Sequence, residues 1–250
     1  NVDSLANLTN LTYLDLSGCN IKNVDSLANL TNLTNLDLSS CYELQNVDEL
    51  ANLTKLTNLN LSSCGSIVQP QKEVMTTRKE VIEYQDKIRF VMALIDGNTK
   101  VLSDYKDNTS LDLSRCNLQN VDVLANLTNL TSLDLSYCKS LQNVDGLANF
   151  SKLASLVLSS CESLQNVDSL ANCSNLTRLD LKCCNFHNVD SLANLTNLNS
   201  LNLSGCESLQ NVDGLSNLTN LTNLDLSHCK SLQNVDGLAN CRKLTCIDLS

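Results

Sequence analysis

NVDSLANLTNLTYLDLSGCNIK (residues 1–22) returns almost unchanged as NVDSLANLTNLTNLDLSSCYELQ (residues 23–45) and NVDELANLTKLTNLNLSSCGSIV (residues 46–68). The pattern resumes at TSLDLSRCNLQ (residues 109–119) and restarts at Asn120, Asn143, Asn166, Asn188, Asn211 and Asn234. The period is 22 or 23 residues, and ten repeats are present, the fourth and the tenth incomplete. Such a fixed period is the signature of stacked supersecondary units, so the internal repetition decides the fold.

Each repeat contains a strand pattern and a turn pattern. In LTYLDLSGC, Leu14 and Leu16 alternate with polar residues, which predicts a short strand with its leucines on one side. NVDSLANL predicts a short helical turn that Asp3 caps through its carboxylate, with Leu5 and Leu8 pointing inward. Because one repeat cannot bury its own leucines, the repeats must stack, with parallel strands ~4.8 Å apart.

The consensus L-x-x-L-x-L-x-x-C resembles the leucine-rich repeat, with Cys where Asn is more usual, and LANLTNLTYLDLS is most similar to the short internalin-type class. The Cys-x-Ser-Leu variant in CKSLQNV also resembles repeats of plant immune receptors and some protozoan proteins. The resemblance implies an α/β solenoid: an arc with a parallel concave sheet, short helical or irregular convex segments, and a role in binding proteins. It covers everything except about residues 68–108.

The expected organisation is three repeats in residues 1–67, an insertion in residues 68–108, and repeats four to ten in residues 109–250, all in one continuous solenoid. The chain begins inside the pattern without Met and stops just before an expected Cys. End repeats expose their leucine layer unless they are capped. We therefore expect a section of a longer array, with further repeats or domains beyond both ends.

The insertion carries a helical pattern, because apolar residues recur every seven positions at Val74, Val81, Ile88 and Ile95. This predicts an amphipathic helix from about Lys72 to Leu94, ended by Asp96-Gly97; a hairpin across IDGNTK is the alternative. The helix either covers the solenoid where convex leucines are missing, or projects as a clamp for a partner. For the clamp, Phe90 is the best hydrophobic anchor.

Nine of the thirteen cysteines occupy one position of the repeat, the ladder cysteines Cys19, Cys41, Cys64, Cys116, Cys138, Cys161, Cys184, Cys206 and Cys229. We expect their thiols to donate to backbone carbonyls of the bend, and Cys173 and Cys241 to lie in the core. A zinc site at Cys183, Cys184 and His187 is disfavoured, because these side chains should point in three different directions. No metal or cofactor is therefore predicted.

Cysteine usage and sequons both bear on the compartment. Many buried free thiols are typical of a reducing compartment. Eleven Asn-Leu-Thr sequons occur, and glycans on repeats ~4.8 Å apart would not fit together, which disfavours a eukaryotic secretory route. The cytoplasm is the predicted location, with a bacterial secreted or surface protein as the alternative. No apolar stretch approaches the ~18 residues of a membrane span.

The formal net charge of −10 belongs to the repeats, since the insertion has seven basic and seven acidic residues. Nine aspartates lie in the turns, and seven form an acidic column between the strand leucines: Asp15, Asp37, Asp112, Asp134, Asp180, Asp225 and Asp248. Neighbouring carboxylates in this column should raise one another's pKa. The column is either a solvated polar face or a stripe that attracts a protein with a basic surface, and its sign disfavours nucleic acid.

Departures from the repeat are the best signal for a site. On the expected concave side they are Tyr13, Arg115, Tyr137, Val157, Arg178, Lys182, Cys183 and His228. Five of them lie on repeats four to seven, directly after the insertion, and Tyr and Arg are favoured binding anchors. These residues, Cys183 excepted, together with Phe90 form the predicted partner-binding set.

Signals of an enzyme are absent from the sequence: it has no Gly-rich phosphate loop, no His-based metal motif and only two histidines. The prediction is a non-catalytic scaffold that binds a protein partner through its concave face and insertion. One alternative is the recognition domain of a larger enzyme or effector, such as a ubiquitin ligase or a nucleotide-binding immune-type protein. Another is a bacterial surface adhesin resembling internalins.

Overall fold

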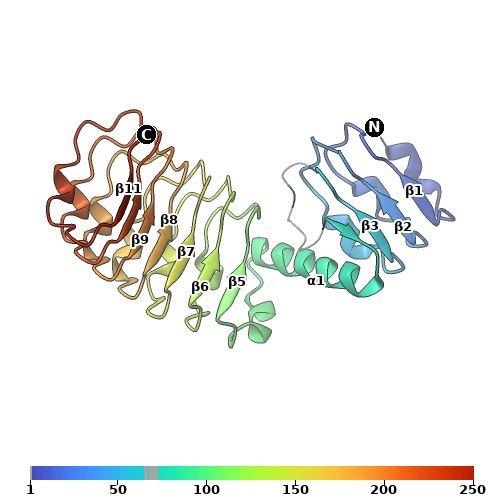
Figure 1. Ribbon diagram of the computed structural model, residues 1–250. Helices are drawn as coiled ribbons and strands as arrows, with labels where there is room; N and C mark the ends of the chain where they lie inside the picture. The colour runs from blue at the N-terminus through green and yellow to red at the C-terminus, as the bar shows by residue number, and fades with distance from the viewer. Residues whose placement is uncertain (1, 65–66, 68–72) are drawn as a thin grey trace. The chain divides into compact units, whose positions relative to one another are not determined.

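The computed structural model describes residues 2–64, 67 and 73–250, and divides into two compact units, Asn1–Asp96 and Gly97–Ser250 (Figure 1). We call them the N-terminal unit and the C-terminal unit and describe each by itself. Both consist of short strands that alternate with 3-10 helical turns. The predicted leucine-rich solenoid arc with a parallel sheet is confirmed, while continuity of one solenoid through both units stays a prediction.

The N-terminal unit has a four-stranded sheet in the order β1-β2-β3-β4. Its strands are β1 (Tyr13–Asp15), β2 (Asn35–Asp37), β3 (Asn58–Asn60) and β4 (Val74–Met75). The first three are parallel and in repeat register, with Leu14 opposite Leu36 and Leu36 opposite Leu59. In contrast, β4 comes from the insertion and pairs antiparallel with β3.

The C-terminal unit has a seven-stranded parallel sheet in chain order. Its strands are β5 (Ser110–Asp112), β6 (Ser132–Asp134), β7 (Ser155–Val157), β8 (Arg178–Asp180), β9 (Ser200–Asn202), β10 (Asn223–Asp225) and β11 (Cys246–Asp248). The middle residue of each is Leu or Ile, and these residues are paired from one strand to the next. One inward apolar residue per strand therefore forms a continuous row, as period-2 alternation predicts.

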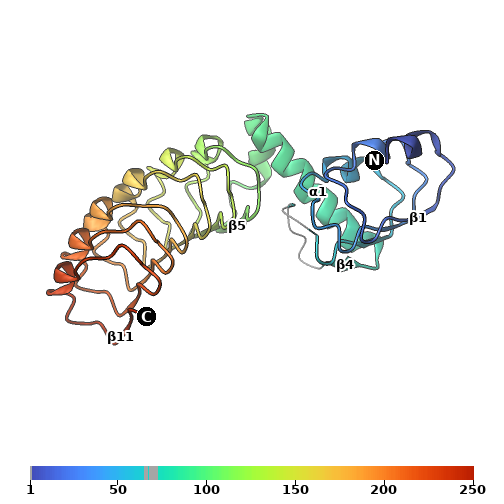
Figure 2. The ribbon, with the colours of Figure 1, turned by 90° about the horizontal axis from the view of Figure 1, so that it is seen from above.

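The turn of each repeat is a 3-10 helix, and Figure 2 shows these turns on the side of the C-terminal unit opposite to its strands. They are η1 (Asp3–Asn7), η2 (Asp25–Leu27), η3 (Asp48–Asn52), η5 (Asp122–Leu124), η6 (Asp145–Leu147), η7 (Asp168–Asn172), η8 (Asp190–Asn194), η9 (Asp213–Leu215) and η10 (Asp236–Leu238). They match the predicted short convex helices.

The prediction that the turn aspartates cap these helices is wrong. Each Asp is already the first helical residue, and no side-chain cap comes from the Val before it. The capping acceptor is the Asn two residues ahead of the Asp: in eight turns its Oδ1 accepts the Asp backbone N–H at 2.7–3.3 Å. The Asp carboxylate instead stands in the first turn, where the helix dipole favours a negative charge.

The core is built from leucines, with Phe150 as its largest fully buried side chain. Ladder thiols close each repeat onto the one before it: Sγ of seven of them donates to a strand-end Leu carbonyl one repeat back, at 3.1–3.3 Å. The expected donation to carbonyls is confirmed. Cys173 and Cys241 lie in the core, as predicted, and donate to Leu147 and Leu215 of the preceding repeat.

Burial of the ladder thiols changes their acidity. Desolvation raises the pKa of Cys64 to about 11, and that of Cys161 and Cys206 to about 12. It also raises the pKa of Cys138 and Cys184 far above the ordinary range. The fold therefore favours the protonated thiol, which is the form that donates a hydrogen bond.

The predicted helix of the insertion is present as α1 (Arg78–Ile95). Its expected start, Lys72, lies outside the described residues. Val74, the first residue of the predicted apolar stripe, is in β4, because Thr77 begins the helix with a capping box to Glu80. Ile95, the last residue of the stripe, is 52% exposed.

The hairpin alternative for the second half of the insertion is wrong. The chain turns at Gly97, where φ is +71°, and continues into the 3-10 helix η4 (Thr99–Asp104). Asn98 begins η4, with its Oδ1 accepting the backbone N–H of Lys100. Asp-Gly here ends a helix, since a left-handed Gly is also a common helix C-terminus.

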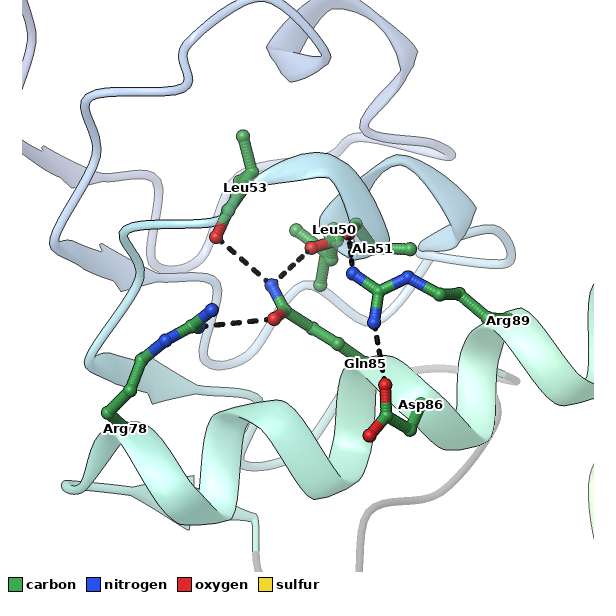
Figure 3. Close-up of polar contacts among 7 residues, drawn as sticks. All are labelled: Leu50, Ala51, Leu53, Arg78, Gln85, Asp86 and Arg89. Atoms are coloured by element: carbon green, nitrogen blue, oxygen red, sulfur yellow. Dashed lines mark hydrogen bonds and ion pairs between the residues drawn. The ribbon is translucent and has the colours of Figure 1, made fainter.

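α1 covers the end of the third repeat in the N-terminal unit. It packs on η3, β3 and β4, and Val81, Tyr84 and Ile88 belong to the same buried cluster as the leucines of repeats one to three. Figure 3 shows the polar side of this contact, where Gln85, Arg78 and Arg89 reach toward the η3 segment. This face of α1 therefore covers the third repeat and does not project from it as a clamp.

Polar side chains of α1 donate to carbonyls of the third repeat. Gln85 is only 1% exposed, and its Nε2 donates to the carbonyls of Leu50 at 2.7 Å and Leu53 at 3.1 Å. Arg78 donates to the Leu56 carbonyl at 2.8 Å and to Oε1 of Gln85 at 3.2 Å. Arg89 donates to the Ala51 carbonyl and also pairs with Asp86. The Leu50 and Leu53 carbonyls also accept the backbone N–H groups of Leu53 and Leu56, so Gln85 is a second donor to each. α1 therefore supplies hydrogen bonds as well as apolar cover.

Candidate interaction surface

The acidic column ends the strands. The Oδ1 atom of each column Asp accepts the backbone N–H two residues later, at 2.8–3.0 Å, and Asn60 and Asn202 do the same where they replace Asp. This local bond turns the chain out of the strand. The column therefore has a structural role in addition to its charge, which the Asp-x-Ser spacing signals in the sequence.

The expected upward pKa shift is wrong at Asp37 and Asp248 of the column. Burial acts to raise the pKa of Asp37, but hydrogen bonds from Ser39 and Asn60 outweigh it and hold this pKa below its usual value. The backbone and side chain of Ser250 lower the pKa of Asp248 in the same way. In both residues, donors to the carboxylate stabilise its charged form more than burial destabilises it.

At the residue immediately before each ladder Cys, the backbone is left-handed. Its φ is +56° to +69° at Gly18, Ser40, Ser63, Arg115, Tyr137, Ser160, Cys183, Gly205 and His228. The N–H groups of these residues, Ser63 apart, donate to a carbonyl of the next repeat at 2.7–2.8 Å, as Tyr137 does to Ser159. This conformation continues the backbone ladder beyond the strand. Gly adopts it freely, whereas a bulky side chain adopts it at a cost.

Arg115 and Tyr137 occupy this left-handed position in successive repeats. The Arg115 guanidinium carbon lies 4.4 Å from the centroid of the Tyr137 ring, so the two form a cation–π pair. Tyr137 remains 44% exposed and Arg115 is half-buried. The structure thus brings together two of the predicted site residues, but in the turn after the strand rather than within it.

Val157 and Arg178 lie on the neighbouring strands β7 and β8, and Lys182 follows β8. Val157 is half-buried and pairs in register with Asp180, while Arg178 is exposed at the start of β8. Lys182 is exposed two residues after β8, and its backbone N–H donates to Asp180 Oδ1 at 3.0 Å. Val157 has no side-chain acceptor. It therefore cannot accept the backbone N–H two residues later, as the aspartates of the acidic column do.

The other predicted residues are scattered. His228 is exposed at the left-handed position of a later repeat, and Tyr13 is 62% exposed in the N-terminal unit. Phe90 is only 6% exposed, so this ring presents no open anchor to a partner. Helical periodicity placed Phe90 off the apolar stripe and did not reveal its burial.

Metal ligation and membrane insertion find no support in the described part of the chain. Cys183 is exposed whereas Cys184 is buried, and over residues 2–64, 67 and 73–250 no group of three or more His, Cys, Asp or Glu is placed to hold a metal. Within the same residues no helix has the length and hydropathy needed to cross a membrane.

Register, repeat length, leucine core and turn geometry together define the class: both units are built from leucine-rich repeats. A family profile described as "Leucine Rich repeats (2 copies)" matches residues 9–52, and one described as "Zer-1-like, Leucine-rich repeats" matches residues 121–190. No curated protein matches the chain. Leucine-rich repeat proteins generally mediate protein–protein interaction.

Two solved structures from Listeria monocytogenes str. 4b F2365 are similar to the chain. An internalin (inlF) is 23% identical, with 100% of this chain and 71% of that chain covered at a TM-score of 0.47. Internalin C2 (inlC2) is 22% identical, with 98% and 83% covered at the same TM-score of 0.47.

Proposed function

We propose that this protein is a non-catalytic scaffold that binds a protein partner through the C-terminal unit. The binding surface is centred on Arg115, Tyr137, Val157, Arg178 and Lys182. It joins the turns after strands β5 and β6 to Val157 of β7, Arg178 of β8 and Lys182 just after β8. Tyr and Arg combine a large contact area with directional hydrogen bonds, and dominate the energetics of many interfaces.

The observation that carries this proposal is the stacked pair of Arg115 and Tyr137 at a left-handed position that Gly or Ser occupies in most other repeats. A non-Gly residue in this region is disfavoured by about 1–2 kcal/mol, and Gly18 and Gly205 show that Gly satisfies the same turn in other repeats. Folding alone does not require a large side chain there. An exposed aromatic ring stacked on a guanidinium, kept at a strained position, is typical of a site selected for binding.

The location that we propose is a reducing compartment such as the cytoplasm. Seven ladder thiols donate to carbonyls of the preceding repeat, and a disulfide would remove those donors. Stability of each repeat thus depends on reduced cysteine. This supports an intracellular scaffold over an exported adhesin.

The test is affinity capture from extracts of the organism that encodes the chain, followed by quantitative mass spectrometry. The variant combines Arg115→Gly, Tyr137→Gly and Arg178→Ser. Gly fits the left-handed turn, and Ser is the residue that Ser155 and Ser200 place beside Arg178 in the sheet. The fold should therefore be retained while specific partners are lost by about tenfold or more, as expected for removal of interface anchors.

A matched control combines Tyr42→Ser and Arg242→Ser, which remove one exposed aromatic ring and one exposed guanidinium elsewhere. The control should capture the same proteins as the unmodified chain. Equal capture by the triple variant and the control, with unchanged circular dichroism, would show that the proposed surface does not bind the partner.

A further inference from the structure

The N-terminal unit has a groove on the strand side that the proposed function leaves unused. Its volume is about 130 Å³, and its lining includes Tyr13, Asn35, Asp37, Asn58, Asn60 and Val74. β4 forms one wall, because it pairs antiparallel with β3 and so interrupts the parallel array. Tyr13 stands at the opposite side, three strands away.

Sheet register sorts the exposed side chains of this groove into two rows. Tyr13, Asn35 and Asn58 are paired from strand to strand and form one row. Asp37, Asn60 and Val74 are paired likewise and form the second row. Paired residues project to the same side of a sheet, so an aromatic ring, amides, a carboxylate and an aliphatic side chain share one surface.

Two features of the groove favour ligand binding: exposed apolar surface at both ends and an open hydrogen-bond acceptor between them. Tyr13 is 62% exposed and Val74 is 41% exposed, so both ends carry open apolar surface. Between them, Asn58 donates through Nδ2 to Thr57 at 3.4 Å, and among the described residues its Oδ1 accepts no hydrogen bond. The floor therefore offers a hydrogen-bond acceptor between two apolar contacts.

We propose that this groove binds an extended peptide segment that carries an arginine or lysine, with the cation over Tyr13 and beside Asp37, and an apolar residue at Val74. This surface is separate from the Arg115–Tyr137 surface, and the inference deepens the proposed scaffold function by naming a second type of partner.

Charge and geometry both favour this occupant. Hydrogen bonds from Ser39 and Asn60 keep Asp37 ionised, and an exposed Tyr ring attracts a cation over its face. The Arg115–Tyr137 pair, 4.4 Å apart, shows the same contact within this chain. Three strand spacings of ~4.8 Å separate Tyr13 from β4, or ~14 Å, which about four residues of an extended peptide span.

The experiment pans the immobilised full chain with a random heptapeptide phage library and measures the enriched peptides by fluorescence anisotropy. The expected peptides carry Arg or Lys with an apolar residue about four positions away. Tyr13→Ser and Asp37→Asn should each weaken binding about fivefold, the size of an exposed cation–π or charged contact. Added salt should weaken it further.

Two controls keep the test decisive. Asp37→Asn preserves the strand-ending bond, because Asn60 makes that bond in the next repeat, so loss of binding is not loss of fold. Tyr42→Ser and the triple variant of the C-terminal unit should bind the peptides unchanged, which separates this surface from the proposed one. Enrichment of acidic peptides, no enrichment, or affinity unchanged by Tyr13→Ser and Asp37→Asn would overturn the proposal, as would selective binding to a glycan array without peptide binding.

Discussion

Equivalent leucine carbonyls in the N-terminal unit and in the C-terminal unit accept hydrogen bonds from different groups. Inside the C-terminal unit, the Leu147 carbonyl accepts Sγ of Cys173 from the following repeat at 3.3 Å. In the N-terminal unit, the equivalent Leu50 carbonyl accepts Nε2 of Gln85 from helix α1 at 2.7 Å. A repeat therefore needs an apolar layer and a few donors from its neighbour, and a helix supplies both as well as another repeat does.

The largest expected effect is that of alkaline pH, which should affect the C-terminal unit more than the N-terminal unit. The ordinary thiol pKa is 9.0, and burial raises that of Cys161 and Cys206 to about 12. Because the folded pKa is raised, the stabilisation is complete below pH 9 and is lost as pH rises toward 12. Hydrogen exchange should show the C-terminal unit opening first.

The matched control is Cys161→Asn, which keeps a donor at the ladder position but cannot ionise. This variant should shift the loss of structure in the C-terminal unit to higher pH. If the unmodified chain keeps the same stability from pH 8 to pH 11, ladder thiols contribute nothing through their protonated form.

Uncovering the third repeat should have the next largest effect. Ile88 is fully buried in the cluster shared by α1 and the leucines, so Ile88→Asp should destabilise the N-terminal unit by about 4 kcal/mol or more. Ile82, 39% exposed on the same helix, is the control, and Ile82→Asp should change stability by no more than about 0.5 kcal/mol. Urea unfolding monitored by hydrogen exchange in each unit distinguishes them. Equal effects of the two variants would mean that α1 does not cover the repeat.

Removing only the donors of the helix should have a smaller effect. Gln85→Leu keeps apolar volume but removes the Nε2 donor from the Leu50 and Leu53 carbonyls, which keep only their backbone donors. It should lower the free energy of unfolding by about 1–2 kcal/mol, the net worth of two hydrogen bonds. Glu83→Gln, at an exposed position of α1, should leave it nearly unchanged. A neutral or stabilising Gln85→Leu, measured by urea unfolding, would show that apolar cover alone seals the repeat.

The smallest expected effect is the coupling between Arg115 and Tyr137. A double-mutant cycle with Arg115→Ser and Tyr137→Ser should give a coupling energy of about 0.5–1 kcal/mol, as for an exposed cation–π pair. Ser is the residue that Ser40, Ser63 and Ser160 carry at this left-handed position. A coupling energy near zero would make the two side chains independent, and the surface would lose its preorganised centre.

Sequence reasoning predicted the repeat, the strand positions and the carbonyl-bonded ladder thiols, because each depends on periodicity and local chemistry. It assigned the turn caps to Asp rather than to Asn two residues earlier, since both types cap helices and only the backbone shows which one precedes the turn. It also placed Arg115 and Tyr137 on the concave side of the sheet. The period-2 alternation had been extended past the end of each strand into the left-handed turn.

For the insertion, the sequence predicted the helix but not its partners. The seven-residue stripe included Val74 and Ile95, whereas the structure places Val74 in β4 and leaves Ile95 exposed. The buried contacts of Gln85 with Leu50 and Leu53 span more than thirty residues of sequence. No local pattern encodes them, because a polar residue on a helix is as often solvated as buried.

The sequence by itself determined that one inward leucine per strand forms a row across the sheet and that ladder thiols donate to backbone carbonyls, since near-identical repeats stack in a single register. Tertiary structure alone decided that β4 pairs antiparallel with β3, that α1 seals the third repeat, and that Arg115 stacks on Tyr137. The first two features depend on contacts between residues that the repeat period does not relate. Arg115 and Tyr137 are one repeat apart, but their contact depends on the left-handed turn that carries both side chains.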